Sequence, residues 1–135
     1  MKKLDFVCFS VNNWEKRRAR KQQFMLHLAL RQDVGRVLYV EPPLSLWRIF
    51  FFSFAELRSP EGRRRWARAI NFKTERASET EKLFIFTPIF FIPFAFRFQA
   101  IYNLNLYICF LIIKPKITGL GLENVVLWLY HPLDY

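Results

Sequence analysis

Polar and aromatic side chains that could bind a small ligand follow each of the predicted strands. The carboxyl ends of parallel strands meet at one edge of an α/β sheet, where ligands bind. In chain order the candidates there are Ser10, Asn12, Asn13, Trp14, Glu41, Thr87, Pro88, Tyr130 and His131. Glu41 is expected to orient a substrate hydroxyl or cap a helix rather than abstract a proton. Asn12, Asn13, Trp14, Glu41 and Tyr130 are therefore predicted to bind substrate.

Arg20, Gln22 and Gln23 lie near the start of the first predicted helix. Backbone N–H groups and the helix dipole favour anions there, and an arginine can hold a diphosphate through two parallel hydrogen bonds. Arg20 equally fits a solvated surface charge within the basic run 16–21, and the glutamines equally fit ordinary helix residues. We expect Arg20 and one of the glutamines to contact substrate.

Catalytic and metal-binding groups are few. His131 is the histidine placed at a strand end, where it is a weak candidate for a base, although a histidine before a proline, here Pro132, is more often a structural turn residue. His27 and His131 lie near no Cys, Asp or Glu at ligand spacing, so no metal site and no cofactor are predicted. Cys8 and Cys109 lie far apart in apolar runs, which indicates buried, reduced thiols rather than a disulfide.

The elements that must position these residues alternate between strand and helix. Strands are predicted at 5–10, 36–40, 83–87 and 125–130, each with the continuous apolar character of a strand covered on both faces. Helices are predicted at 15–31, ended by Gly35, at 44–57, at 60–72 after the N-cap Ser59, and at 99–113. Residues 74–82 are predicted to form a loop. The expected fold is α/β, a Rossmann-like parallel sheet with flanking helices.

The net charge of +10 is unevenly distributed over the 135 residues. Residues 1–82 contain 18 Lys and Arg against 9 Asp and Glu, and residues 83–135 contain 3 against 2. A basic first half and a Phe-rich second half indicate a partner that is both anionic and apolar, such as a phospholipid surface. The residues predicted to contact the membrane are Trp47, Phe50, Phe51, Phe52, Arg63, Arg64 and Arg65. No nucleic-acid-binding module is recognised, so nucleic acid is not an expected partner.

The apolar run 83–113 is the candidate for a membrane-spanning segment. Pro88, Pro93 and Arg97 interrupt it, and a charge or a proline is costly within a bilayer. We therefore expect a buried strand, a proline-bounded loop and an apolar helix, and keep a small integral membrane protein as an alternative. The first residues lack the cleavage site of a signal peptide.

Several of these segments together resemble the N-terminal domain of bacterial GT-B glycosyltransferases of the teichuronic-acid and exopolysaccharide type. They are Asn-Asn-Trp-Glu at 12–15, Arg-Lys-Gln-Gln at 20–23, Gly-Arg-Val-Leu-Tyr-Val-Glu-Pro-Pro at 35–43 and Val-Val-Leu-Trp-Leu-Tyr-His-Pro at 125–132. The resemblance covers nearly the whole chain, loosely between residues 44 and 82. Such enzymes are two to three times longer.

The resemblance implies that residues 1–135 are the acceptor-side half of a hexosyltransferase, without the nucleotide-sugar domain and inactive alone. It implies sugar transfer from a nucleotide sugar to a glycan or lipid-linked acceptor of the cell envelope. The expected location is cytoplasmic, peripheral at the inner face of the cell membrane. The alternative is a non-catalytic membrane-associated module, or half of a split transferase whose donor domain is a separate chain.

Overall fold

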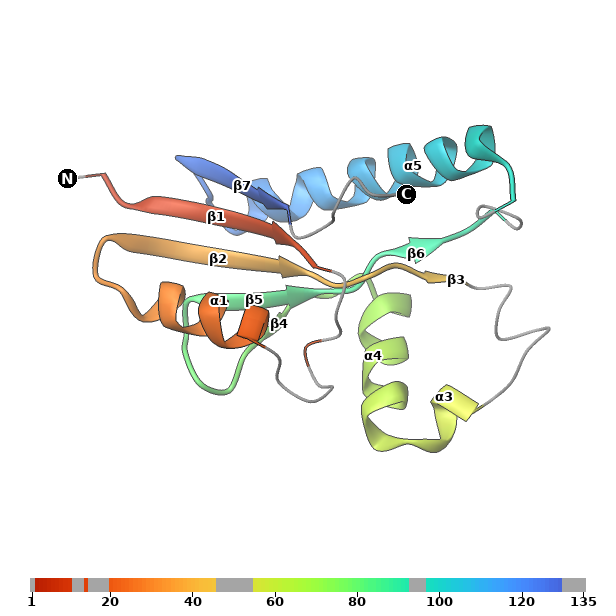
Figure 1. Ribbon diagram of the computed structural model, residues 1–135, viewed down its shortest axis with the longest axis horizontal. Helices are drawn as coiled ribbons and strands as arrows, with labels where there is room; N and C mark the ends of the chain where they lie inside the picture. The colour runs from red at the N-terminus through yellow and green to blue at the C-terminus, as the bar shows by residue number, and fades with distance from the viewer. Residues whose placement is uncertain (1, 11–13, 15–19, 46–54, 93–96, 130–135) are drawn as a thin grey trace.

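The computed structural model describes residues 2–10, 14, 20–45, 55–92 and 97–129. They form an α/β fold around a five-stranded sheet in the order β4-β5-β2-β1-β7 (Figure 1). The strands are β1 (Leu4–Phe9), β2 (Val34–Val40), β4 (Glu75–Arg76), β5 (Leu83–Phe86) and β7 (Val125–Leu129). β1, β2, β5 and β7 run parallel, which confirms the four predicted parallel strands. Counted among the four parallel strands alone, the order across the sheet is β5, β2, β1 and β7.

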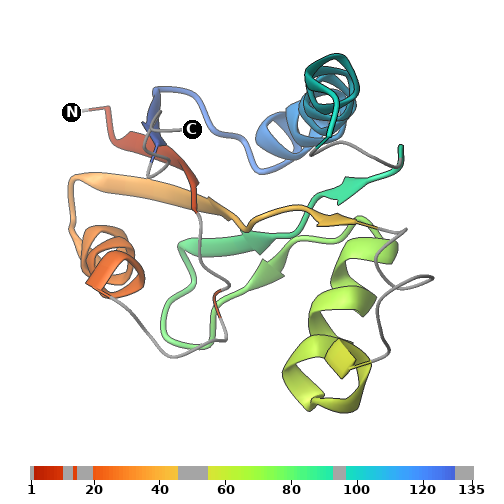
Figure 2. The same ribbon diagram turned by 45° about the vertical axis from the view of Figure 1, so that its right-hand side comes forward.

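Two helices cover opposite faces of this sheet, as Figures 1 and 2 show: α1 (Arg20–Leu30) on one face and α5 (Gln99–Gly119) on the other. Alternate strand residues divide between two cores because successive side chains point to opposite faces. Phe6, Cys8, Val37 and Tyr39 pack with Met25 and Ala29 of α1. Val7, Leu38, Val40 and Phe86 pack with Cys109 and Ile113 of α5.

Gly35 does not end the first helix as predicted, because it lies inside β2. A Cβ atom at this position would lie 2.3 Å from Oδ1 of Asp5. That buried carboxylate accepts hydrogen bonds from the backbone N–H of Arg36 (2.7 Å) and of Glu123 (2.9 Å). The glycine therefore makes room for a carboxylate that joins β1 to β2 and to the segment before β7.

The helix predicted at 60–72 is α4 (Pro60–Ile70), with Ser59 as its N-cap. The Ser59 hydroxyl accepts a hydrogen bond from the Gly62 N–H at 3.0 Å, which confirms the predicted start. Trp66 and Arg68 of this helix are buried, whereas Ile70 is exposed.

Two further predictions differ from the structure, and a third is tested only in part. The loop predicted at 74–82 contains β4, which pairs antiparallel with β5 and is too short to show a sequence period. The helix predicted at 44–57 is wrong at its start, because Leu44–Ser45 form β3, which pairs with β6 (Ile89–Phe90). The end of the predicted helix agrees with α3 (Ala55–Arg58). Residues 46–54 lie outside the described residues. The helix predicted at 15–31 is described only from Arg20 to Leu30.

The final helix is longer and less buried than predicted. α5 continues through Pro115 to Gly119, although a proline inside a helix removes one backbone donor and its ring crowds the carbonyl four residues earlier. Only Asn105, Cys109 and Ile113 of this helix are buried. β7 is likewise not covered on both faces as predicted, since Val125 and Leu127 are exposed.

Candidate functional site

The carboxyl ends of β2 and β5 hold a buried cluster of charged and polar groups. Glu41 directly follows β2 and is 2% exposed, and Thr87 directly follows β5. Arg68 of α4 donates from Nη2 to Oε2 of Glu41 at 2.9 Å and from Nε to the Thr87 hydroxyl at 3.1 Å. The Thr87 hydroxyl in turn donates to the same Glu41 oxygen at 2.5 Å. These bonds join α4 to the residues that follow the carboxyl ends of β2 and β5.

The other Glu41 oxygen holds the chain after β1. Oε1 of Glu41 accepts the backbone N–H of Trp14 at 2.7 Å. The Trp14 ring meets the Tyr39 ring edge to face, with centroids 5.1 Å apart. The Tyr39 hydroxyl donates to Ser10 Oγ at 2.5 Å. Two predicted site residues, Trp14 and Glu41, are thus in direct contact.

Arg68 also extends the cluster to β4, where its Nη1 donates to Oε2 of Glu75 at 2.6 Å. Arg64, one helical turn before Arg68, donates to the other Glu75 oxygen. Partial burial acts to raise the pKa of Glu75, but hydrogen bonds from Arg68 and Arg64 outweigh it and hold this pKa below its usual value. Glu75 is therefore ionised at neutral pH.

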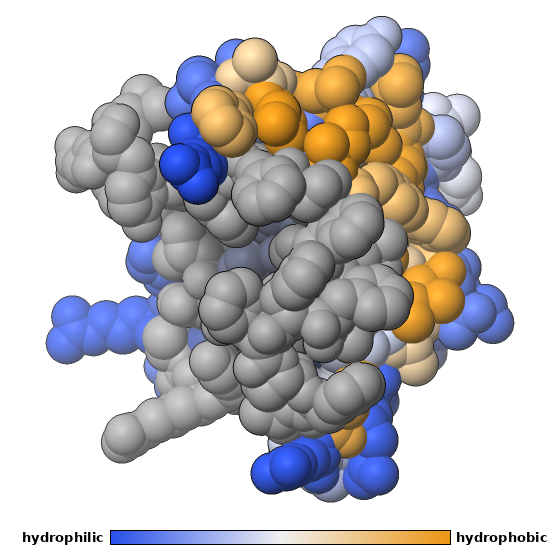
Figure 3. All heavy atoms as spheres, turned by 90° about the vertical axis from the view of Figure 1, so that its right-hand side faces the viewer, coloured by the Kyte–Doolittle hydropathy of each residue, from blue (hydrophilic) through white to orange (hydrophobic). Residues whose placement is uncertain are grey.

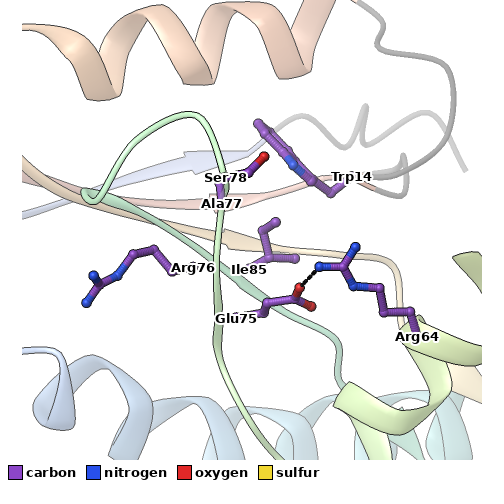
Figure 4. A pocket seen from close by; sticks show the side chains of 7 residues that line it. All are labelled: Trp14, Arg64, Glu75, Arg76, Ala77, Ser78 and Ile85. Carbon is purple, nitrogen blue, oxygen red and sulfur yellow. Dashed lines mark hydrogen bonds and ion pairs between the residues drawn. The ribbon is translucent and has the colours of Figure 1, made fainter.

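Next to this cluster lies an open pocket of about 290 Å³ (Figure 4). Its lining residues come from the chain after β1, from α4 and from the β4–β5 region: Trp14, Arg64, Glu75, Arg76, Ala77, Ser78 and Ile85. In Figure 4 Arg64 and Glu75 point toward one another, and the Ser78 hydroxyl lies on the same side as the Trp14 ring. The pocket thus combines an aromatic ring with a hydroxyl and charges of both signs.

The two carboxylates of the cluster, Glu41 and Glu75, each form an ion pair with Arg68. A second hollow of about 330 Å³ lies at the same ion pair, lined by Arg64, Ala67, Arg68, Asn71, Lys73, Thr74 and Glu75. Arg64 and Glu75 therefore contribute to both concave surfaces.

The other predicted site residues lie in different places. Gln22 is 1% exposed in the interior, whereas Arg20 and Gln23 are on the surface of the first turn of α1. Arg63 is exposed, and Arg65 turns toward the sheet, where it donates to the Pro42 carbonyl at 2.7 Å. The remaining predicted residues, Asn12, Asn13, Trp47, Phe50, Phe51, Phe52, Tyr130 and His131, lie outside the described residues.

The sequence analysis missed Arg68, Glu75, Arg76 and Ser78. The spacing of Arg64 and Arg68 places both on one side of a helix, but this pattern is typical of a solvated basic face. Glu75, Arg76 and Ser78 fell in the segment predicted as a loop. Their role depends on β4 pairing with β5, which brings them beside Trp14.

Neither cysteine, Cys8 nor Cys109, has a thiol positioned to act as a nucleophile, since both are buried. Burial raises the pKa of Cys8 to about 12, although nearby Lys21 acts in the opposite direction, and burial raises the pKa of Cys109 to about 12. Among the described residues no group of three or more His, Cys, Asp or Glu side chains is arranged to hold a metal ion.

Comparison of the chain with protein-family models, with curated proteins and with solved structures found no match.

Proposed function

We propose that this chain is the acceptor-side domain of a bacterial GT-B glycosyltransferase. In this proposal it holds a glycan or lipid-linked acceptor at the inner face of the cell membrane while a sugar is transferred from a nucleotide sugar. The observation that carries the proposal is the pocket of Trp14, Arg64, Glu75 and Ser78 beside the carboxyl ends of the parallel strands. Doubly wound sheets bind their ligands at this edge.

The chemistry of the pocket fits a saccharide attached to an anionic group. The Glu75 carboxylate can accept hydrogen bonds from sugar hydroxyls, and the Ser78 hydroxyl can donate to them and accept from them. The ring of Trp14 adds an apolar wall, as expected of a pocket that orients its ligand through a few polar groups. Arg64 and Arg76 add two guanidinium groups suited to a diphosphate.

The buried cluster supports a binding role for this chain. The side chains of Glu41, Arg68 and Thr87 satisfy one another's hydrogen-bonding groups. A satisfied network of this kind holds the residues beside the pocket in one arrangement. A preformed pocket loses little entropy when it binds its ligand. We infer that nucleotide-sugar binding and catalysis require a further domain, in the same chain or in a separate one.

The test is binding of two soluble probes, measured by saturation-transfer NMR on the purified chain. One probe is a disaccharide linked through a diphosphate to a short prenyl chain, and the other is the same disaccharide alone. We expect both to show contacts at their sugar protons, with tighter binding of the diphosphate. Arg64→Ala should weaken the diphosphate probe about tenfold, since a hydrogen bond to a charged group contributes about 1.5–3 kcal/mol.

Arg63→Ala is the matched control, because Arg63 is exposed on the same helix and does not line the pocket. It should bind both probes as the unaltered chain does. The absence of binding to either probe would overturn the proposal. Preferential binding of a nucleotide sugar would instead assign the chain to the donor side.

A further inference from the structure

The outer side of α5 is a hydrophobic stripe. Leu104, Tyr107 and Leu111 follow one another at spacings of three and four residues, and Phe110 lies beside them. Their exposed fractions are 48%, 60%, 49% and 56%. Hydrophobic residues gather in the upper part of Figure 3, the level at which α5 lies in Figures 1 and 2. A contiguous exposed patch of this kind marks a contact with a partner or a membrane.

The opposite side of α5 is tied to the protein. Asn105 is fully buried and donates to the carbonyls of Ile92 and Ile101, each at 3.1 Å, while its Oδ1 accepts the Ile92 N–H at 3.1 Å. One and two turns further along, Cys109 and Ile113 pack against the sheet. One side of the helix is therefore committed to the core, and the other is available to a partner.

Because only one side of α5 packs against the protein, the helix can lie in the plane of a bilayer interface more easily than it can span the bilayer. α5 is long and apolar enough to cross a membrane by length and composition. Surrounding it with lipid would pull Cys109 and Ile113 out of the core or draw the sheet into hydrocarbon, where its edge groups would lack hydrogen-bond partners. A helix that lies in the plane of the interface keeps its core contacts and buries only its outer side.

The charges around the stripe match an anionic surface. The sequence contains no Asp or Glu between residues 82 and 122, whereas it contains Arg97, Lys114 and Lys116. Arg97 precedes the helix, and Lys114 lies on its exposed side near the C-terminal end. A second copy of this face would offer no acidic partner to these cations, whereas anionic phospholipid headgroups would bind them.

We propose that the outer face of α5, formed by Leu104, Tyr107, Phe110 and Leu111, lies in the plane of an anionic phospholipid bilayer. The aromatic and aliphatic side chains enter the boundary between headgroups and acyl chains, and Arg97 and Lys114 contact the headgroups. These residues are not among those that the sequence predicted to contact the membrane. The inference deepens the membrane location in the proposed function but does not depend on glycosyl transfer.

The test is flotation of the purified full chain with vesicles of phosphatidylcholine, with or without phosphatidylglycerol. We expect binding to the anionic vesicles. Phe110→Ser with Leu111→Ser should weaken it about tenfold or more, since each buried side chain of this size contributes strongly to membrane binding. Lys114→Gln should weaken binding to anionic vesicles about fivefold, because each surface cation contributes about that factor.

Leu30→Ser is the matched control. Leu30 is 56% exposed, as much as Phe110, but it lies on α1 at the other face of the sheet. This variant should float like the unaltered chain. All variants replace exposed side chains, and circular dichroism verifies that each remains folded.

Three results would overturn the inference. One is vesicle binding unchanged by the double substitution in α5. Another is a dimer in solution that the double substitution dissociates, without vesicle binding, which would assign the face to a second copy. The third is resistance of the native protein to extraction by alkaline carbonate, which would indicate a spanning helix. Saccharide binding without vesicles is measured separately, so failure of this inference is distinguishable from failure of the proposed function.

Discussion

The guanidinium of Arg68 lies 2.9 Å from the carboxylate of Glu41, and both side chains are almost completely buried. One partner belongs to α4 and the other follows the central strand β2, so the ion pair joins the α4 region to the main sheet. Thr87 and Glu75 complete the hydrogen bonding of the guanidinium. A buried pair with such partners is tolerated, whereas a lone charge in the same place is not.

Replacing Arg68 should therefore destabilise the fold strongly. Arg68→Ala leaves the Glu41 carboxylate buried without its closest cation, and we expect a loss of about 3–5 kcal/mol in the free energy of unfolding. Arg63→Ala, at an exposed position of the same helix, should change it by less than about 0.5 kcal/mol. Urea denaturation followed by circular dichroism measures both. Equal effects of the two substitutions would show that the pair does not anchor α4.

The lowered pKa of Glu75 predicts a loss of stability in acid. Because the folded pKa lies below the usual value of 4.5, the unfolded chain takes up the proton first as the pH falls. The stabilisation is complete above pH 4.5 and is lost as the pH falls through the folded pKa. Glu75→Gln should be less stable than the unaltered chain at pH 7, and this difference should shrink toward pH 3.

Thermal unfolding at a series of pH values measures the effect. Glu61→Gln is a suitable control, because Glu61 is exposed in the first turn of α4. A difference between Glu75→Gln and the unaltered chain that stays constant from pH 7 to pH 3 would contradict the assigned ion pairs.

The two buried thiols should be unreactive in the folded protein. A pKa of about 12 leaves each almost entirely protonated at pH 7, and burial excludes reagents from both. We expect Ellman's reagent to label neither Cys8 nor Cys109 until the chain unfolds, and then to label both. Labelling of either residue faster than unfolding would show that its surroundings open locally.

The parallel strands could be predicted because each strand sequence is itself continuously apolar, which indicates a buried strand. Cys8, Leu38 and Ile85 lie in short apolar runs bounded by turn residues, and these runs became neighbouring strands of the sheet. The start of α4 could also be predicted from neighbouring residues alone, since Ser59 and Pro60 form the sequence pattern of a helix N-terminus.

The features missed by the sequence analysis depend on contacts between distant residues. Gly35 was assigned to a helix end, yet its small size serves the Asp5 carboxylate thirty residues earlier in the chain. Arg68 was missed because its partners, Glu41 and Thr87, are 27 and 19 positions away in the chain. Such pairs leave no periodic pattern in the sequence, so the sequence alone pointed to this pocket only through Trp14 and the residues at the strand ends.

Asn105 should be essential for the attachment of α5 to the body of the protein. It satisfies both the N–H and the carbonyl of Ile92, and Asn105→Ala would leave these groups without that partner. We expect a loss of about 1–3 kcal/mol in the free energy of unfolding. Asn105→Asp should be no better, because the carboxylate still accepts the Ile92 N–H but faces the Ile92 carbonyl without a donor.

Asn103→Ala is the matched control, two residues earlier and exposed on the same helix. Hydrogen exchange should locate the effect, with faster exchange of α5 amides in Asn105→Ala and unchanged exchange in β2. Asn105 is buried on the inner side, so its loss loosens α5 without altering the exposed stripe. If α5 exchanges equally slowly in both variants, the packing of Cys109 and Ile113 alone holds the helix, and the asparagine only fills space.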